Sequence, residues 1–360
     1  MKAAVFHAAL QPLIIENIEV DKPLSREVLV RTVASGVCHS DLHFVDGLYP
    51  MQGPAILGHE AAGIVEAVGD QVVEFKPGDH VIACLSVFCG HCKFCLEGRP
   101  NLCQNPEVRT RPGGRPKYTL NGSPVAQFAN LGSYAEQMLV HENTLVKIGN
   151  DMPFKQAALI GCGVTTGVGA VLNTAQVRPG ATVAVWGAGG VGLSAIQGAR
   201  IAGAGMIIAV DTVESKLKTA RDLGATHVVD ASSHDPVEAV RNLTGGGVEF
   251  SFEAIGNKRA AEQCYESLAR GGTATIIGMI PVGQKLEIDG PSLLGEKKLQ
   301  GSSMGSNRFR IDMPKYVDFY KRGLLKLDEM ITRTGKLEDV NEAFRAMKAG
   351  EVARTVLTFD

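Results

Sequence analysis

The chain has 360 residues, more than one hydrophobic core usually serves, so two domains are expected. With 36 basic and 38 acidic residues its formal net charge is -2, which excludes the basic surface of a protein that binds nucleic acid or an anionic membrane. A hydrophobic content of 45% excludes disorder. Glycine makes up 42 of the 360 residues, about 12% against a usual share of about 7%, which indicates the many tight turns of an α/β enzyme.

The sequence contains no recognisable targeting segment or membrane span. The apolar run before Pro12 is short and acidic residues follow it, unlike a signal peptide. The most apolar later stretch, residues 181–210, is interrupted by seven glycines and by Arg200, so it lacks the ~20 apolar residues of a spanning helix. We therefore expect a cytoplasmic protein that has neither a membrane nor a nucleic acid as partner.

The first half of the chain, residues 1–155, is expected to be mostly β. The Pro77-Gly78-Asp79 tripeptide predicts a turn, and short apolar runs predict strands at 28–33, 63–68 and 80–84. The polar segment 104–130 is unusually long for a loop. Its three arginines would suit an anionic substrate, but we expect them to be solvated: Arg109, Arg111 and Arg115.

From Gly180 onward, strand and helix patterns alternate. The apolar periodicity predicts helices at 189–202 and 215–223 and strands at 181–186, 206–211, 248–253 and 273–278. Such alternation predicts a parallel, doubly wound sheet. The last stretch is expected to be helical at 314–322 and 337–348 and to end in a strand at 353–359 that returns to the first domain.

Four of the eight cysteines follow the pattern Cys-x2-Cys-x2-Cys-x7-Cys: Cys89, Cys92, Cys95 and Cys103. Four thiolates at this spacing can complete the closed tetrahedron of a structural zinc site. A redox dithiol would use only two of them, and an iron-sulfur cluster is the weaker alternative. We expect the zinc to stabilise a lobe and to take no part in chemistry. Taken alone, the other cysteines are typical of small buried hydrophobes: Cys38, Cys84, Cys162 and Cys264.

A glycine-rich turn follows the first predicted strand of the second half and opens a helix. Its sequence is Gly187-Ala188-Gly189-Gly190-Val191-Gly192, and Asp211 ends the next strand, nineteen residues after the last glycine. These glycines allow the turn, the approach of backbone N–H groups to a pyrophosphate, and the packing of helix on strand. Asp211 would accept hydrogen bonds from a ribose and repel a 2′-phosphate, so NAD is expected over NADP.

Four motifs occur in this order: Gly-Val-Cys-His-Ser-Asp at 36–41, Gly-His-Glu at 58–60, the four-cysteine pattern and the glycine turn. Together they resemble the zinc-dependent alcohol dehydrogenases of the medium-chain dehydrogenase/reductase superfamily, over essentially the whole chain. The resemblance implies an α/β protein with a GroES-like β-rich catalytic domain and a Rossmann coenzyme domain built on a doubly wound parallel sheet. It implies a catalytic domain at 1–163 with a structural zinc lobe at about 86–104, an NAD-binding domain at 164–303 and a return to the catalytic domain at 304–360.

The resemblance also implies a catalytic zinc, held, as is general in alcohol dehydrogenases, by two cysteines and a histidine. The matching residues are Cys38, His59 and Cys162, which leaves the fourth position to water or substrate. Because zinc lowers the pKa of bound water to about 7, a bound alcohol should also lose its proton readily. Glu60 resembles the family's acid behind the metal. Two zinc ions per chain are therefore expected, one catalytic and one structural.

Further roles follow from the resemblance alone. Ser40 resembles the hydroxyl that accepts the alcohol proton, and His43 the base that passes it to solvent through the cofactor ribose; without the motif, His43 would be an ordinary surface histidine. Thr166 and Val191 match positions that press the nicotinamide toward the substrate. The remaining matches concern the ribose and the phosphates: Lys216 for a ribose, Arg354 for the pyrophosphate, and His39 where related enzymes often carry arginine.

The implied activity is reversible hydride transfer from an alcohol to NAD, giving an aldehyde or ketone. Leu85 matches a pocket position often filled by an aromatic ring, so primary alcohols with a sizeable apolar or aromatic group are expected. Tyr49 stands where glutathione-dependent formaldehyde dehydrogenases carry an acid, which counts against that subgroup. We further expect a homodimer or homotetramer.

Two alternatives stay open. Within the family, the chain could oxidise a polyol or an amino alcohol. From another class, it could be a non-catalytic NAD-binding structural or regulatory protein. The joint presence of an open metal site and a proton path argues against the second alternative, because a binding protein needs neither.

Overall fold

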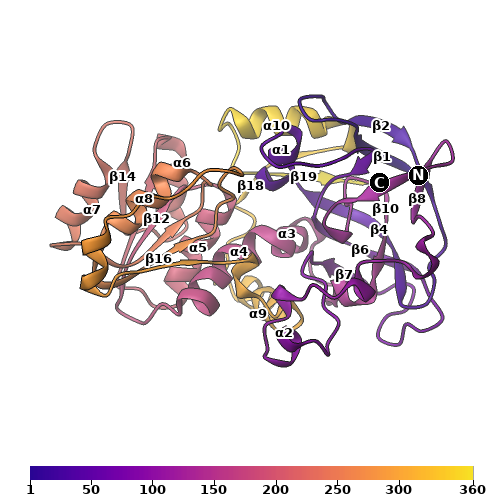
Figure 1. Ribbon diagram of the computed structural model, residues 1–360, viewed down its shortest axis with the longest axis horizontal. Coiled ribbons are helices and arrows are strands. Elements are labelled where there is room, and N and C mark those ends of the chain that lie inside the picture. The colour runs from indigo at the N-terminus through magenta and orange to yellow at the C-terminus, as the bar shows by residue number, and fades with distance from the viewer. Residues whose placement is uncertain (360) are drawn as a thin grey trace. The chain divides into compact units, whose positions relative to one another are not determined.

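The computed structural model describes residues 1–359 and divides them into two compact units (Figure 1). The β-rich unit comprises Met1–Cys162, Arg308–Tyr320 and the described residues from Leu327 onward. The parallel-sheet unit comprises Gly163–Asn307 and Lys321–Lys326. The chain therefore passes from one unit to the other four times, after residues 162, 307, 320 and 326.

The β-rich unit is built on two sheets. A six-stranded sheet has the order β2-β1-β5-β9-β8-β3; its strands are β1 (Lys2–Phe6), β2 (Ile14–Asn17), β3 (Glu19–Val20), β5 (Ala55–Ile56), β8 (Tyr118–Leu120) and β9 (Ser123–Gln127). A seven-stranded sheet has the order β11-β7-β6-β4-β19-β18, with β10 also on β4; its strands are β4 (Glu27–Gly36), β6 (Glu60–Val68), β7 (His80–Ala83), β10 (Gln137–His141), β11 (Leu145–Lys147), β18 (Ile331–Gly335) and β19 (Arg354–Thr358). The strands predicted in the first half are confirmed.

Strand β4 organises the seven-stranded sheet. It pairs antiparallel with β6 along most of its length, with β10 near its start and with β19 near its end. Val28, Val30 and Ala34 on this strand are fully buried, because strands on both sides and the core cover them. The ladder ends with Gly36 opposite Glu60, so the segments that follow β4 and precede β6 are brought together.

The C-terminal part of the β-rich unit contains helices α9 (Phe309–Lys321) and α10 (Val340–Lys348). Helix α9 begins five residues before the predicted start at 314, and at this end the carboxylate of Asp312 accepts the N–H of Arg308 over 2.8 Å. The guanidinium of Arg310 then lies over the ring of Phe88, 5.3 Å from its centroid. This contact anchors α9 beside the cysteine-rich segment.

The parallel-sheet unit confirms the predicted doubly wound architecture. Its six strands, all parallel, have the order β14-β13-β12-β15-β16-β17: β12 (Thr182–Trp186), β13 (Met206–Asp211), β14 (His227–Asp230), β15 (Val248–Glu253), β16 (Leu268–Ile276) and β17 (Lys298–Gly301). Figure 1 shows the helices of this unit around the sheet: α5 (Gly190–Ile201), α6 (Glu214–Asp222), α7 (Pro236–Thr244) and α8 (Lys258–Glu266). The chain winds outward from β12 in one direction and from β15 in the other. The switch between them is where such sheets bind ligands.

A helix that the sequence analysis did not predict runs over Phe154–Ala175, through α3 (Phe154–Leu159), a π-helical turn (Ile160–Val164) and α4 (Thr165–Gly169). This helix was not predicted because glycine disfavours helix and the segment contains several glycines. The packing requires these glycines, since a Cβ on Gly167 would lie 2.3 Å from the carbonyl oxygen of Val191. This helix, rather than 181–210, is long and apolar enough to cross a membrane, but 83% of its most apolar window is buried inside the protein.

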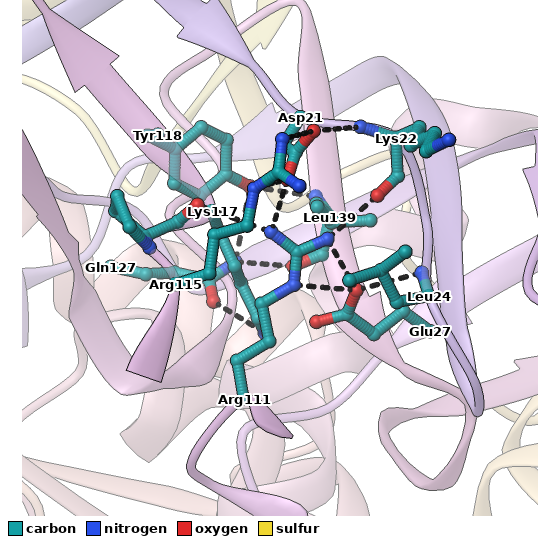
Figure 2. A network of polar contacts seen from close by, with 11 residues as sticks. Asp21, Lys22, Leu24, Glu27, Arg111, Arg115, Lys117, Tyr118, Gln127 and Leu139 are labelled. Atoms are coloured by element: carbon teal, nitrogen blue, oxygen red, sulfur yellow. Dashed lines mark hydrogen bonds and ion pairs between the residues drawn. The ribbon is translucent and has the colours of Figure 1, made fainter. Parts of the chain in front are cut away.

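The long segment 104–130 is not a solvated loop. It contains the hairpin of β8 and β9, and Arg111 is buried at its base (Figure 2). The Arg111 guanidinium pairs with Asp21 over 2.7 Å and with Glu27 over 3.0 Å. Arg115, by contrast, is exposed and pairs with the same Asp21 over 2.8 Å. The expectation that all three arginines are solvated is therefore wrong for Arg111.

The geometry explains why Arg111 is buried. Its guanidinium also donates to the carbonyl oxygens of Lys22 and Pro116, over 2.6 and 3.1 Å. The N–H groups of Arg111 therefore have acceptors both near the N-terminus of the chain and within segment 104–130 itself. A buried arginine is tolerated when it is paired and hydrogen-bonded in this way. Arg109 is likewise engaged and donates to the carbonyl oxygen of Cys103 over 2.6 Å.

We predict that Arg111→Met lowers the free energy of unfolding by about 3–5 kcal/mol, because it leaves the carboxylates of Asp21 and Glu27 without their buried partner. The matched variant is Arg115→Met, which should cost at most about 1 kcal/mol because Arg115 is exposed. Urea denaturation of both variants and the parent in zinc-containing buffer measures the difference. Equal losses for the two variants would contradict the assignment.

Candidate active site

The four cysteines of the predicted structural site converge. Their sulfur atoms all lie within 4.8 Å of one another, with Cys92 at 3.5 Å from Cys95 and 3.8 Å from Cys103. A regular tetrahedron of four Zn–S bonds of ~2.3 Å has edges of about 3.8 Å. The spacing of these sulfur atoms therefore fits zinc with four protein ligands.

Backbone donors and a small core fix the cysteine-rich lobe. The N–H groups of Cys89 and Cys92 point at the sulfur atoms of Cys103 and Cys89, over 3.4 and 3.3 Å. Val87 and Val108 pack beneath the cysteines. The lobe contains α2 (Lys93–Leu96), whose first residue follows Cys92. Such N–H groups stabilise thiolate charge and so favour metal binding.

A second metal-ligating group lies where the β4–β6 ladder ends. Cys38 follows β4 and precedes helix α1 (His39–Val45), whereas His59 precedes β6. Cys162 comes from the π-helical turn of the long helix. The ligand atoms of these three residues and of Glu60 lie within 4.8 Å of one another, and all four residues are buried. The structure thus brings together the four residues predicted around the catalytic zinc.

The imidazole of His59 is oriented for a metal. Its Nδ1 lies 3.1 Å from both carboxylate oxygens of Asp41, whereas its Nε2 is buried without a hydrogen-bond partner. A buried polar nitrogen costs free energy unless something binds it. The free Nε2 beside two thiols therefore fits a zinc ion. Asp41 is a site residue that the sequence analysis missed, although it lies in the quoted Gly-Val-Cys-His-Ser-Asp motif.

The two thiols of this group differ in their electrostatics. The hydrogen bond from Cys162, against the cost of burial, holds the pKa of Cys38 well below its usual range. The same hydrogen bond, together with burial, raises the pKa of Cys162 well above its usual range. One thiolate is thus already favoured, and the second proton leaves when a cation binds.

Glu60 is fully buried and forms an ion pair with Arg354 of β19. Burial raises the pKa of Glu60 to about 7, although the Arg354 guanidinium opposes the shift. Gly36 makes the contact possible, since a Cβ there would lie 2.1 Å from Oε2 of Glu60. The side chain of Arg354 is thus directed at the metal-ligating group, and its expected contact with the pyrophosphate stays a prediction.

Helix α1 carries the three other predicted residues of this region. Oγ of Ser40 lies 3.6 Å from Sγ of Cys38. His43 is half-buried, burial lowers its pKa, and its ring is roughly parallel to that of Tyr49, with 6.0 Å between the centroids. His39 is exposed at the start of the helix. The helix therefore presents a hydroxyl and a neutral imidazole next to the cluster.

Aromatic rings line the same region of the β-rich unit. Phe128 lies edge-on to the imidazole of His59, with centroids 5.8 Å apart. The ring of Phe44 packs against that of Phe128, with 4.8 Å between the centroids. Phe128 was not among the predicted site residues, because it lies in the segment expected to be a polar loop. These rings give the cluster an apolar border.

The glycine turn lies in the parallel-sheet unit, at the end of β12. Gly187 has φ +93°, and a Cβ on Gly192 would lie 1.7 Å from the carbonyl oxygen of Gly187. Around Gly189, by contrast, nothing lies within 4 Å of an added Cβ. Helix α5 begins at Gly190 with no side-chain cap. Open space at an uncapped helix N-terminus fits a pyrophosphate.

The other predicted cofactor residues of this unit lie around the turn. Oδ2 of Asp211 accepts the N–H of Ala188 over 2.7 Å, which ties the acid to the turn. Lys216 lies on α6, the helix that follows Asp211. Thr166 precedes Gly167, whose backbone contacts Val191 of α5. The donors and the space at this turn fit NAD.

Three comparisons with known proteins agree with this site. Residues 25–150 match the alcohol dehydrogenase GroES-like domain, and residues 190–322 match the zinc-binding dehydrogenase family. The chain is 39% identical over 364 residues to alcohol dehydrogenase class-3 of Myxine glutinosa, covering 99% of this chain and 97% of that protein. It is also 39% identical over 367 residues to S-(hydroxymethyl)glutathione dehydrogenase of Haemophilus influenzae, covering 99% and 97%.

Among solved structures, benzyl alcohol dehydrogenase from Acinetobacter calcoaceticus is similar, with a TM-score of 0.94 and 34% sequence identity over 100% of this chain and 99% of that one. Full-length matches of this kind cover both units and both metal-ligating groups. The chain therefore belongs to the zinc-dependent medium-chain alcohol dehydrogenases, and it is an NAD-dependent enzyme with one structural and one catalytic zinc site.

Proposed function

We propose that the enzyme oxidises primary alcohols that carry a sizeable apolar or aromatic group to aldehydes, and that it reduces the aldehydes with NADH. The observation that carries this proposal is the buried group of Cys38, His59 and Cys162, in which Nε2 of His59 has no protein partner. Three ligands leave one position of a zinc ion open to an alcohol. The ring of Phe128 beside His59 supports an apolar substrate.

In the proposed mechanism, Cys38, His59 and Cys162 hold the catalytic zinc, and Glu60, paired with Arg354, is the acid behind it. When bound, zinc supplies the positive charge that lowers the pKa of an alcohol hydroxyl. The hydroxyl of Ser40 accepts the alcohol proton.

His43, on the same helix as Ser40, is the base that would pass the proton on to solvent once NAD is bound. Burial lowers the pKa of His43, so its ring is neutral at neutral pH and able to accept a proton. Ser40 and His43 are three residues apart, a spacing that sets side chains on one face of a helix. The proton path thus uses one face of α1.

We propose that, in the parallel-sheet unit, backbone N–H groups of the turn bind the pyrophosphate and that Asp211 and Lys216 bind the ribose. Thr166 and Val191 would position the nicotinamide ring, and NAD, when bound, would supply the hydride acceptor. For His39 and Arg354 of the β-rich unit, a role toward the pyrophosphate is proposed from the family resemblance alone. The proposed division is a catalytic domain at 1–163 and 304–360 and a coenzyme domain at 164–303.

A second candidate substrate is S-(hydroxymethyl)glutathione, because a curated relative at 39% identity is named for it. This adduct carries carboxylates and would need cationic partners. Of the arginines in segment 104–130, Arg111 is already paired with Asp21 and Glu27, and Arg115 with Asp21. Tyr49 lies against Phe44 and His43 and offers a ring at this position. These contacts favour the apolar alcohol.

We further propose a cytoplasmic homodimer or homotetramer. None of the eight cysteines, all of which lie within the described residues, forms a disulfide, as expected in a reducing compartment. Three apolar side chains of the parallel-sheet unit are exposed and would be covered if copies of the chain associated: Val282, Leu293 and Leu294.

A substrate panel tests the proposed function. With NAD, kcat/KM should be highest for aromatic and longer aliphatic primary alcohols, and lower for S-(hydroxymethyl)glutathione, a polyol and an amino alcohol. NADH formation is followed by absorbance. A preference for S-(hydroxymethyl)glutathione would overturn the substrate class. Absence of turnover with every alcohol, despite two bound zinc ions, would favour a non-catalytic role.

Ser40→Ala should lower kcat by ~10²–10⁴-fold, because general acid-base assistance is worth that much, and should leave both zinc ions and NADH affinity nearly unchanged. Ser40→Thr retains a hydroxyl and should recover most of the activity. Steady-state kinetics with zinc analysis measures both variants. A Ser40→Ala enzyme within about twofold of the parent would remove Ser40 from the proton path.

Asp211→Ala should shift the NAD-to-NADP ratio of kcat/KM toward NADP by about tenfold or more, because hydrogen bonds to a charged group are worth about 1.5–3 kcal/mol. Asp230→Ala is the control, since Asp230 lies opposite Asp211 at the end of the neighbouring strand. The control should leave the ratio unchanged. An unaltered ratio in Asp211→Ala would mean that another residue selects the cofactor.

A further inference from the structure

Tyr134 is connected to the proposed zinc ligand His59 through one carboxylate. The tyrosine is fully buried, and its hydroxyl donates to Oδ2 of Asp41 over 2.9 Å. Asp41 is also fully buried, and both of its oxygens lie 3.1 Å from Nδ1 of His59. The three side chains therefore form a continuous chain of hydrogen bonds that ends at the unpartnered Nε2 of His59.

The backbone holds Tyr134 firmly at this place. Its N–H donates to the carbonyl oxygen of Leu57 over 2.9 Å, and its own carbonyl oxygen accepts the N–H of Ala4 over 2.8 Å. Gly58 has φ +90°, and a Cβ there would lie 2.6 Å from the backbone nitrogen of Tyr134 and 2.7 Å from Cδ1 of its ring. The tyrosine is thus packed against the residue that immediately precedes His59.

Three groups can donate hydrogen bonds to the buried carboxylate of Asp41. Its donors are the N–H of Gly58, over 2.9 Å, the imidazole of His59 and the hydroxyl of Tyr134. A buried carboxylate needs such donors, and each one also restricts its rotation. The Gly58 N–H binds Oδ1, so the Tyr134 hydroxyl is the donor that holds Oδ2 besides the imidazole of His59, which lies 3.1 Å from both oxygens.

We propose that Tyr134 is a positioning residue for the catalytic zinc. Its hydroxyl fixes the Asp41 carboxylate, the carboxylate keeps the proton of His59 on Nδ1, and Nε2 is thereby presented to the ion. This inference rests on the proposed ligand set of Cys38, His59 and Cys162. Partners that orient a metal-binding histidine typically contribute 10–100-fold in metal affinity or activity, and a residue one step further out is expected at about the lower end of that range.

The test is zinc release from the holoenzyme, followed with a colorimetric chelator in the parent and in Tyr134→Phe. The parent should release two zinc ions in two phases, the three-ligand site first and the four-cysteine site later. Tyr134→Phe should accelerate the first phase about tenfold and leave the second unchanged. The four-cysteine site thereby reports, within each sample, that the β-rich unit is folded.

Tyr118→Phe is the matched control. Tyr118 is equally buried in the same unit, but its hydroxyl accepts the N–H of Leu139 over 2.6 Å, away from the zinc ligands (Figure 2). This variant should release both ions at the parent rates. A double-mutant cycle with Asp41→Asn completes the test: if Tyr134 acts through Asp41, the effects of the two substitutions will not add.

The outcomes separate the inference from the proposed function. One zinc per chain in the parent would overturn the ligand set itself. Two zinc ions, with the first phase at the parent rate in Tyr134→Phe, would overturn only the role of Tyr134. Equal acceleration in Tyr118→Phe, or additive effects with Asp41→Asn, would show a general loss of stability and would also overturn it.

Discussion

The pairing of β4 with β6 is the constraint on which the catalytic region depends. The two strands meet with Gly36 opposite Glu60, and the proposed zinc ligands lie just beyond this pair. Cys38 follows one strand and His59 precedes the other, so the backbone ladder brings together two proposed ligands that are 21 positions apart in sequence. The third proposed ligand, Cys162, comes from the π-turn of a helix, and the residue before it lies near the same strand end. A Cβ on the neighbouring Gly161 would lie 3.6 Å from Cα of Glu60.

The region around the proposed catalytic zinc contains several buried charged groups. His59, Glu60, Asp41 and Arg354 are all nearly inaccessible to solvent, and each has a partner of opposite charge or a strong donor. Removing ions from water is costly, so such groups persist only when their partners are held in place. Arg111 with Asp21 and Glu27 follows the same rule at the base of segment 104–130, without any chemistry. One arrangement can therefore serve catalysis and the other stability.

Much of the fold could be predicted from the sequence, because its signals are local. The glycine turn after an apolar strand and the acid at the end of the next strand require only neighbouring residues, and both lie where predicted. The four-cysteine site is similarly local. The helix over 154–175 was missed, because its glycines disfavour helix alone and are required only by contacts with distant backbone.

The proposed metal-binding residues of the candidate site could be predicted from the sequence, but the residues that hydrogen-bond to them could not. Asp41 lies in a motif that was quoted from the sequence. Its position in the sequence does not indicate, however, that its carboxylate accepts a hydrogen bond from the hydroxyl of Tyr134, 93 residues away. The buried state of Arg111 likewise depends on carboxylates some 90 positions earlier. Such pairings are set by sheet register, which composition and spacing do not reveal.

The topology also imposes an order on biosynthesis. Strand β19 pairs with β4, and its first residue, Arg354, is the partner of the buried Glu60. Residues 354–358 are translated after the whole parallel-sheet unit, so the seven-stranded sheet, two of whose strands flank Cys38 and His59, is incomplete until then. Until residue 354 has been translated, the parallel-sheet unit can fold as a unit, whereas Glu60 still lacks its counter-charge.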